Sequence, residues 1–449
     1  MSIFFTPEPH LLDSPRHREW PLSRLSGVPP RAGEPPRTAD VVIVGAGPAG
    51  VAVASALWHH GVRDVVLLDQ AGRPCGRFFD RIDILRQRIL RSPYEHHPGV
   101  EGYRDCELLD FARLHWSLLT GVERREVRMA QAGHRSVVPV DVFEAYCRHV
   151  ADTHHVSART WPATVQEVLP AGRAVTVSTS RFTVSASFVV LCTGEERRPA
   201  PASWWGGDPA PAGVSWWDEA MPDDVGDVVV VGAGLTSAHL ISNALAAGRR
   251  VRWVIREAAE RYQCSDVNSA FFRAEGRARF GGLPWADRLR MMREHRRASV
   301  MFEFAPLLRR AEADGRLIVY RGGTVEAVTS GAGTAAVRLA SGDVVAGDHV
   351  VLALGTAPPA SERLLPEHVT GTREGWPDLD ERTLAYRRAP RVLAVGAAAG
   401  MVLGPAARNI DGHRVATARV AAAVAGGLRR DGLPVAADGA RAGQLIAHV

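Results

Sequence analysis

The sequence predicts an α/β protein with two three-layer domains, because one strand–turn–helix pattern occurs twice along its 449 residues. The first copy starts with four β-forming residues (41–44), continues into a glycine-rich loop and ends in an alanine-rich helix. The second copy repeats this order from residues 228–231. A chain of this length is also too long for one ordinary hydrophobic core, so more than one domain is expected.

The glycine-rich loop of each copy has the pattern of a phosphate-binding turn. Residues 45–50 read Gly-Ala-Gly-Pro-Ala-Gly, and residues 232–237 read Gly-Ala-Gly-Leu-Thr-Ser. Glycine permits a tight turn and lets the backbone approach a pyrophosphate closely. The free N–H groups at the start of the following helix then face the anion. Both copies are therefore typical of Rossmann-like dinucleotide-binding domains.

The residue that ends the second strand carries opposite charge in the two copies. Asp69 lies nineteen residues after Gly50, and Arg256 lies nineteen residues after Ser237. An acidic side chain at this position accepts hydrogen bonds from a free ribose diol, whereas a cationic one suits a 2′-phosphate. The sequence therefore predicts FAD in the first domain and NADPH in the second.

Each glycine-loop unit is followed by a small antiparallel insert and a buried strand that enters a Thr-Gly or Gly-Thr turn, at residues 193–194 and 355–356. A late strand (391–396) and a last helix (about 406–425) have no counterpart in the second half, so we expect them to return to the first domain. This predicts an NADPH domain inserted in a discontinuous FAD domain. The expected divisions are an N-terminal strap (1–37), the first part of the FAD domain (38–222), the NADPH domain (223–345), the second part of the FAD domain (346–430) and a C-terminal tail (431–449).

Periodicity predicts the remaining elements. Apolar residues at helical spacing indicate helices, and short runs of β-branched residues bounded by turn formers indicate strands. The expected helices are 108–119, 141–153, 285–295 and 298–313. The expected strands are 164–168, 174–179, 182–186, 188–191, 317–320, 324–328, 335–339 and 349–354.

Composition excludes several kinds of chemistry. All 54 basic side chains are arginine, so a Schiff-base lysine or a lysine general base is absent. The five cysteines form no CxxC pair, which argues for a reducing compartment and against a disulfide reductase. The arginines are dispersed, and the apolar runs contain glycine turns, so we expect a soluble cytoplasmic protein that binds neither nucleic acid nor membrane. Adjacent histidines point in different directions and chelate poorly, so no metal site is expected.

The motifs together resemble the two-dinucleotide-binding-domain flavoproteins, in particular the flavin-dependent monooxygenases that include lysine/ornithine N-hydroxylases and Baeyer–Villiger-type enzymes. The resemblance covers about residues 38–430 and rests on the two loops, Asp69, and the segments 192–194, 354–356 and 395–409. It implies a glutathione-reductase-like arrangement of the two Rossmann-like domains. It also implies that segment 395–409 closes over the isoalloxazine and ribityl chain of FAD.

The candidate cofactor contacts follow from these motifs and the segments beside them. For FAD they are Gly45, Gly47, Pro48, Ala49, Gly50, Asp69, Gln70, Arg77, Val165, Thr193, Gly194, Gly396 and Pro405. For NADPH they are Gly232, Gly234, Leu235, Thr236, Ser237, Arg256, Gly355 and Thr356. No triad or carboxylate pair identifies catalytic residues. Asn409, Arg408 and Arg91 are candidates for groups beside the flavin or substrate. For Arg91, the alternative is packing within an ordered loop.

The resemblance implies an NADPH-dependent FAD monooxygenase. Hydride from NADPH would reduce FAD, and reduced FAD with O₂ would give a C4a-(hydro)peroxide that oxygenates an amine nitrogen, a sulfur or a carbonyl of a small molecule. Secondary metabolism is one setting that the resemblance suggests. Two alternatives stay open: an NADPH-dependent reductase that passes electrons to a quinone or protein acceptor, and a non-catalytic redox sensor. The substrate and the oligomeric state do not follow from the sequence.

Overall fold

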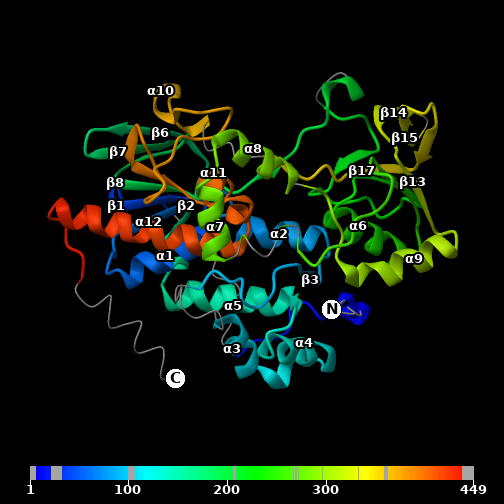
Figure 1. Cartoon of the computed structure of the whole chain (residues 1–449), viewed down its shortest axis with the longest axis horizontal. Helices are drawn as coiled ribbons and strands as arrows, with labels where there is room; N and C mark the ends of the chain where they lie inside the picture. The colour runs from blue at the N-terminus through cyan, green and yellow to red at the C-terminus, as the bar shows by residue number, and fades with distance from the viewer. Residues whose placement is uncertain are drawn as a thin grey trace.

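Two β-sheets organise the chain into two lobes (Figure 1). This computed structural model describes residues 7–21, 33–99, 107–205, 209–265, 267, 271, 273–295, 297–331, 333–357 and 363–436. We refer to the lobe built on the larger sheet as the first unit and to the lobe built on the five-stranded sheet as the second unit. Within the described residues, no helix combines the length and the apolar character needed to cross a bilayer.

The first unit takes its sheet from both ends of the chain. Its strand order is β19-β20-β8-β1-β2-β5, with the antiparallel strands β6 and β7 attached through β8. β20 pairs in parallel with β8, with Val392 opposite Val189, so the late strand returns to the first sheet as expected. The strands are β1 (Thr38–Val44), β2 (Val65–Asp69), β5 (Thr160–Pro162), β6 (Val165–Ala171), β7 (Ala174–Thr179), β8 (Thr183–Leu191), β19 (Ala385–Tyr386) and β20 (Ala389–Ala394).

Two helices from opposite ends of the chain pack together on the first sheet (Figure 1). They are α1 (Pro48–His59), which follows the first glycine loop, and α12 (Ile410–Arg430). Gly427 lets α12 lie directly on the sheet, because a Cβ there would stand 2.3 Å from Cζ of Phe188 on β8. The last helix is longer than the predicted 406–425 and starts later, after a 3-10 turn.

The second unit has a fully parallel five-stranded sheet in the order β10-β17-β11-β12-β13. The divisions expected at 222/223 and 345/346 are wrong for this sheet, because β10 and β17 lie outside 223–345 and pair within it. The error arises because the two strands are short and flank the unit at both of its ends. The strands are β10 (Val214–Trp216), β11 (Asp227–Val231), β12 (Arg250–Ile255), β13 (Leu317–Arg321) and β17 (His349–Leu352), and an antiparallel insert contains β14 (Val325–Gly331), β15 (Thr334–Leu339) and β16 (Val344–Gly347).

The helical segments follow the sequence pattern with shifted ends. The predicted helix 141–153 is α5 (Val140–Thr153). The predicted helix 298–313 starts only at α9 (Ala305–Ala313), because Pro306 is tolerated in the first turn of a helix but not in its interior. The others are α2 (Gly76–Ile84), α3 (Glu107–Leu114), α4 (Gly121–Gln131), α6 (Leu235–Ala246), α7 (Ala274–Gly281), α8 (Trp285–Glu294), α10 (Glu367–Thr370) and α11 (Gly400–Leu403).

Short two-stranded ribbons complete the architecture. β9 (Glu196–Arg197) and β18 (Thr356–Ala357) pair antiparallel where the chain passes between the two units, and we refer to this pair as the connecting ribbon. β3 (Ile89–Leu90) pairs with β4 (Val138–Pro139).

The described part of the N-terminal strap contacts both units. Leu11 is fully buried in the core of the second unit. Arg18 forms ion pairs with Glu123 at 2.7 Å and with Asp141 at 2.6 Å, on α4 and α5 of the first unit. All three of these charged side chains are largely buried, so solvent and salt screen their attraction less than that of surface ion pairs. The segments 1–6 and 22–32 of the strap, and 437–449 of the C-terminal tail, lie outside the described residues.

Candidate functional site

The first glycine loop forms a tight turn at the carboxyl end of β1. Gly45 has φ +97°, and a Cβ at this position would stand 2.4 Å from the carbonyl oxygen of Cys192, so the loop needs glycine here. A Cβ on Gly50 would stand 2.0 Å from the carbonyl oxygen of Gly45. A Cβ on Gly47 would meet no atom within 4 Å, so this glycine faces open space. α1 starts at Pro48, and no side chain caps its first N–H groups.

Asp69 is held against this loop by the backbone. Its Oδ2 accepts a hydrogen bond from the amide of Ala46, and its Oδ1 accepts one from the amide of Ala71, both at 2.8 Å. Each carboxylate oxygen has a further lone pair, so the side chain can also accept from a diol. The loop and Asp69 therefore meet the two requirements of a dinucleotide site, an anion-binding helix start and an acidic strand end.

The second glycine loop repeats this geometry with small differences. Gly232 has φ +131°, and a Cβ there would stand 2.3 Å from the carbonyl oxygen of Ala353. α6 starts at Leu235, after Gly234, and again no side chain caps its first turn. Ser237 occupies the third glycine position, and its buried Oγ has no hydrogen-bond partner among the described residues. The loop thus presents free backbone N–H groups in the way the first loop does.

Arg256 stands at the end of β12 as the counterpart of Asp69. Its side chain is 79% exposed, and its nearest acidic neighbour is Glu257 at 3.5 Å. It is available for a ligand phosphate. Arg252, which could have assisted it, instead forms an ion pair with Asp227 at 2.7 Å. Because Asp227 starts β11, this pair lies toward the opposite end of the strands from the loop.

The two Thr-Gly and Gly-Thr turns meet at the connecting ribbon. Thr356 donates a hydrogen bond from its hydroxyl to Oε2 of Glu195 at 2.5 Å. Arg408 donates to the same oxygen at 2.7 Å and also contacts the hydroxyl of Thr356 at 3.1 Å. Glu195 directly follows Thr193 and Gly194. Three segments that are far apart in sequence are therefore joined by the carboxylate of Glu195, a residue to which no sequence motif pointed.

The late segment lies beside the start of α12. Gly396 has φ +87° and begins a 3-10 turn, while Pro405 begins the 3-10 turn that leads to the helix. Asn409 is the N-cap residue of α12. His413, one turn further on, has its Nε2 3.7 Å from the position that a Cβ on Gly396 would occupy. Burial lowers the pKa of His413 to about 4, so the ring is neutral at pH 7.

Arg91 connects the first unit to the second. Its guanidinium donates to Oγ of Ser299 at 3.1 Å and to the backbone oxygen of Ser299 at 2.5 Å. On the second unit it also influences His239 of α6, whose pKa is lowered to about 3 by burial and by the charge of Arg91. Arg91 is thus engaged at the contact between units, and His239 is a further group that the sequence pattern did not reveal.

Three further predicted FAD contacts, Gln70, Arg77 and Val165, lie in the first unit. Gln70 is exposed just after Asp69, and Val165 begins β6 near the strand that pairs with β2. Arg77 lies in the first turn of α2 and lines a cavity beside the connecting ribbon. Within the described ranges, no group of three or more His, Cys, Asp or Glu side chains is arranged to hold a metal ion.

Comparisons with known proteins confirm the resemblance to FAD/NAD(P)-binding flavoproteins. Residues 134–277 match the family described as pyridine nucleotide-disulphide oxidoreductase, and residues 43–101 match the NAD(P)-binding Rossmann-like domain. No curated protein sequence matches the chain.

Solved structures match over most of the chain. The ornithine hydroxylase of Pseudomonas aeruginosa is 18% identical with a TM-score of 0.70, and the match covers 87% of this chain and 100% of that one. The ornithine N-hydroxylase of Kutzneria sp. 744, solved with reduced FAD, NADP⁺ and L-ornithine, is 18% identical with a TM-score of 0.68 and coverages of 88% and 100%. The bacillithiol disulfide reductase of Bacillus cereus is 17% identical with a TM-score of 0.58 and coverages of 87% and 99%. These likenesses show a shared fold.

Proposed function

We propose that the protein is an NADPH-dependent FAD monooxygenase that oxygenates a soft nucleophile of a small molecule, an amine nitrogen or a sulfur in the first place. The observation that carries the proposal is the pair of glycine loops with opposite charges at the strand ends, Asp69 and Arg256, within one chain. The fold shared with N-hydroxylating enzymes supports it. In this proposal the second unit is the NADPH domain, inserted in a discontinuous FAD domain.

The first unit fits a dinucleotide with a free ribose. The open face of Gly47 and the uncapped start of α1 suit a pyrophosphate, and Asp69 suits the ribose diol. Thr193 and Gly194, together with Gly396, Pro405 and Asn409, would border the rest of FAD. When bound, FAD and NADPH supply hydride transfer and O₂ activation.

The second unit fits a dinucleotide that carries a 2′-phosphate. The uncapped start of α6 would hold the pyrophosphate, and the exposed guanidinium of Arg256 would pair with the 2′-phosphate. Glu195, Thr356 and Arg408 would keep the connecting ribbon aligned with the start of α12, so that the two units face each other in one orientation. The chain's own tasks are then to bind, to orient and to exclude water from the reacting atoms.

The test is oxygen transfer from labelled O₂. Purified protein should be yellow, and NADPH should bleach the flavin without air. With ¹⁸O₂ and an amine such as L-ornithine or a thioether, the overall reaction is substrate + NADPH + H⁺ + O₂ → oxygenated product + NADP⁺ + H₂O. One ¹⁸O atom per product, with one NADPH consumed, is the expected result. NADPH consumption that yields only hydrogen peroxide with every amine and sulfur compound tested would contradict the proposal.

The reductase alternative has its own observation in its favour. The fold is shared with a disulfide reductase as well as with hydroxylases. However, the described cysteines Cys75, Cys147, Cys192 and Cys264 are free, and no CxxC pair exists in the sequence. A reductase of this chain would therefore pass electrons to a quinone or a protein acceptor, which an assay with a soluble quinone detects. A colourless protein that ignores NADPH would favour the redox sensor.

A further inference from the structure

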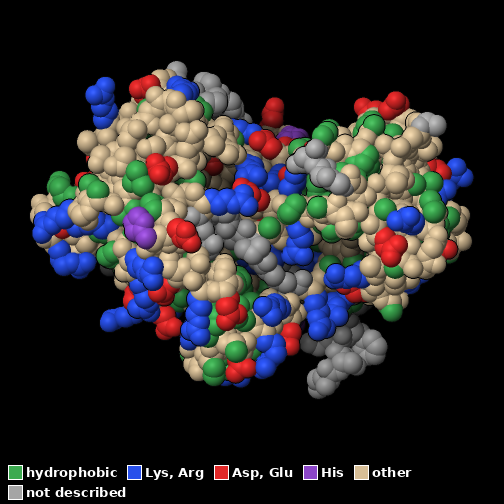
Figure 2. Space-filling view, turned by 90° about the horizontal axis from the view of Figure 1, so that it is seen from above, with side chains coloured by type: hydrophobic (Ala, Val, Ile, Leu, Met, Phe, Trp, Pro, Cys, Tyr) green, Lys and Arg blue, Asp and Glu red, His purple; other side chains and the backbone are tan. Residues whose placement is uncertain are grey.

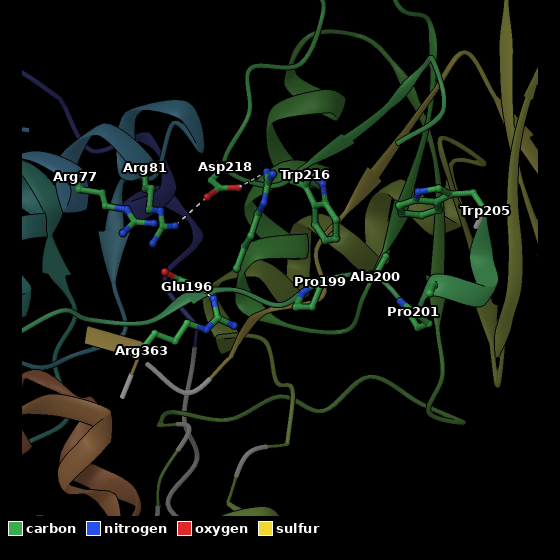
Figure 3. A pocket seen from close by; sticks show the side chains of 12 residues that line it. Arg77, Arg81, Glu196, Pro199, Ala200, Pro201, Trp205, Trp216, Asp218 and Arg363 are labelled. Carbon is green, nitrogen blue, oxygen red and sulfur yellow. Dashed lines mark hydrogen bonds and ion pairs between the residues drawn. The ribbon is translucent and has the colours of Figure 1, made fainter. Parts of the chain in front are cut away.

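A cavity of about 570 Å³ lies beside the connecting ribbon, between the two units (Figure 3). Its walls come from α2 of the first unit, from β9 and the segment 199–202, and from the carboxyl end of β10. None of the residues that line it belongs to either glycine loop. The volume falls in the range of about 300–1,000 Å³ that is typical of small-molecule sites. The cavity is therefore large enough for a ligand of its own.

The cavity has a charged end and an apolar end (Figure 3). The space-filling view also shows arginine side chains gathered where the two lobes meet (Figure 2). The charged end contains Arg77, Arg81, Arg363, Glu196 and Asp218. The apolar end contains Pro199, Ala200, Pro201 and Trp205, and Trp216 lies between the two ends.

Positive charge exceeds negative charge at the charged end. Asp218 pairs with Arg81 at 2.9 Å, whereas Arg197 lies 3.5 Å from its other oxygen and pairs more closely with Glu219. Arg363 reaches Glu196 only at 4.0 Å. Arg77 has no ion pair among the described residues. Burial, and next the charge of Arg77, lower the pKa of Arg81, so the arginines repel one another at this end. An anion placed here would relieve that repulsion.

A hydrogen-bond donor without an acceptor stands at the apolar end. The indole N–H of Trp205 is buried and has no partner among the described residues. A buried donor that stays unpaired costs free energy, and an oxygen acceptor on a ligand would remove that cost. Trp216 supplies an aromatic wall between the two ends, and the guanidinium of Arg197 already lies 4.9 Å from its ring centroid. A flat ring in the space between the ends would therefore stack against the planar guanidinium of Arg197, which covers the ring of Trp216.

We propose that this cavity binds an elongated aromatic carboxylate, with the carboxylate at the arginine end, the ring beside Trp216, and a second oxygen acceptor at the indole N–H of Trp205. Arginine pairs with carboxylates through two parallel hydrogen bonds, which suits this end of the cavity. Because the walls belong to both units, the ligand would span the connection between them. The proposal does not depend on which reaction the flavin site performs.

The experiment is calorimetric titration of the flavin-loaded protein with a probe and two analogues. The probe is 6-methoxy-2-naphthoate, which has the carboxylate, the ring and the second acceptor. We expect 6-methoxy-2-naphthamide, which lacks the charge, to bind at least about tenfold more weakly. We expect 2-naphthoate, which lacks the methoxy oxygen, to bind about fivefold more weakly. Equal binding of the acid and the amide, or no binding of the probe at about 1 mM, would overturn the proposal.

Two variants test the ends separately. Arg363→Gln removes a charge from an 82% exposed side chain, and Trp205→Phe removes the N–H donor while it keeps a ring. Each should weaken probe binding about fivefold, and Trp205→Phe should abolish the preference for the methoxy group. Arg173→Gln, at an 85% exposed position in the β6–β7 turn, is the control and should leave binding unchanged. Unchanged binding in both test variants, or displacement of the probe by saturating NADP⁺, would contradict a separate site.

Discussion

The two glycine loops follow one backbone plan but close differently at their third small residue. In the first loop, a Cβ on Gly50 would stand 2.0 Å from the carbonyl oxygen of Gly45. In the second loop, Ser237 occupies the same position, and its Oγ would lie 3.2 Å from a Cβ on Gly232. The first loop therefore requires glycine for steric reasons, whereas the second loop is wide enough for a small side chain. A departure from the glycine pattern is tolerated where the backbone leaves room for it.

The strand ends differ in how firmly the fold holds them. Asp69 accepts two backbone hydrogen bonds and is fixed before any ligand arrives. Arg256 is 79% exposed and makes one distant ion pair. A short acidic side chain can be positioned by the loop beside it, while a long cationic one is ordered only when its anion binds. We therefore expect recognition of the first nucleotide to be built into the fold and recognition of the second to depend on the ligand.

The largest effect should come from adding a side chain at Gly50 in the first loop. Gly50→Ala forces a methyl group against the carbonyl oxygen of Gly45, so the loop must open and the phosphate-binding turn is lost. We expect nearly complete loss of flavin and a destabilisation of about 1–3 kcal/mol. The flavin-to-protein absorbance ratio and thermal unfolding measure both.

A matched substitution in α12 provides the control. A Cβ at Gly426 would have only the tip of the Arg430 side chain, at 3.5 Å, within ordinary contact. Gly426→Ala should keep its flavin and be neutral or stabilised by up to about 1 kcal/mol. Normal flavin content in Gly50→Ala would show that flavin binding does not require glycine at this position of the loop.

The second strand end should decide between NADPH and NADH. Arg256→Ala removes a charge-assisted contact worth about 1.5–3 kcal/mol, so the Michaelis constant for NADPH should rise about tenfold or more while that for NADH changes little. Arg250→Ala changes another exposed arginine of the same strand, at its opposite end, and should leave the preference intact. An equal effect of Arg256→Ala on both nucleotides would refute the assignment of this arginine to a 2′-phosphate.

A buried histidine distinguishes the two loop helices. The fifth residue of α1 is Ala52, while the fifth residue of α6 is His239, whose pKa is lowered to about 3. The pKa in the unfolded chain is about 6.5, so this histidine contributes stability that is present above pH 6.5 and is lost as the pH falls toward 3. At pH 5 the loss amounts to about 2 kcal/mol.

The free energy of unfolding, measured by urea titration, should therefore fall less between pH 7.5 and pH 5 in His239→Leu than in the wild-type protein. The exposed His134→Leu is the control and should follow the wild-type protein. Identical slopes for the wild-type protein and His239→Leu would show that His239 is not held neutral by the fold.

The smallest effect is expected at Ser237. Its buried hydroxyl has no partner among the described residues, so Ser237→Ala removes an unsatisfied polar group and leaves the small volume in place. The free energy of unfolding should change by less than about 1 kcal/mol, in the stabilising direction. The Michaelis constant for NADPH should stay the same. A marked increase in this Michaelis constant would mean that the hydroxyl of Ser237 contacts the nucleotide.

Much of this fold could be predicted from the sequence, because its main signals are local. Four consecutive β-formers before each loop, alanine-rich helices after them and turn residues between short strands specify elements within about ten residues of chain. For this reason β7, α5 and both strand–loop–helix units match the prediction. The charge difference between Asp69 and Arg256 is equally local, since it depends on a spacing within one βαβ unit.

The tertiary structure decided what depends on contacts between distant segments. No local pattern shows that β10 and β17 pair at the edge of the second sheet, or that Glu195, Thr356 and Arg408 meet at the connecting ribbon. The same holds for Arg91, for which the sequence left open a position beside the flavin or substrate and the packing of an ordered loop, and whose guanidinium donates to Ser299 in the structure. The sequence by itself determined the two strand–loop–helix units and their opposite strand-end charges. Only packing decided how the units are joined and which arginines share a cavity, because the direction of a long side chain is set by the partners that surround it.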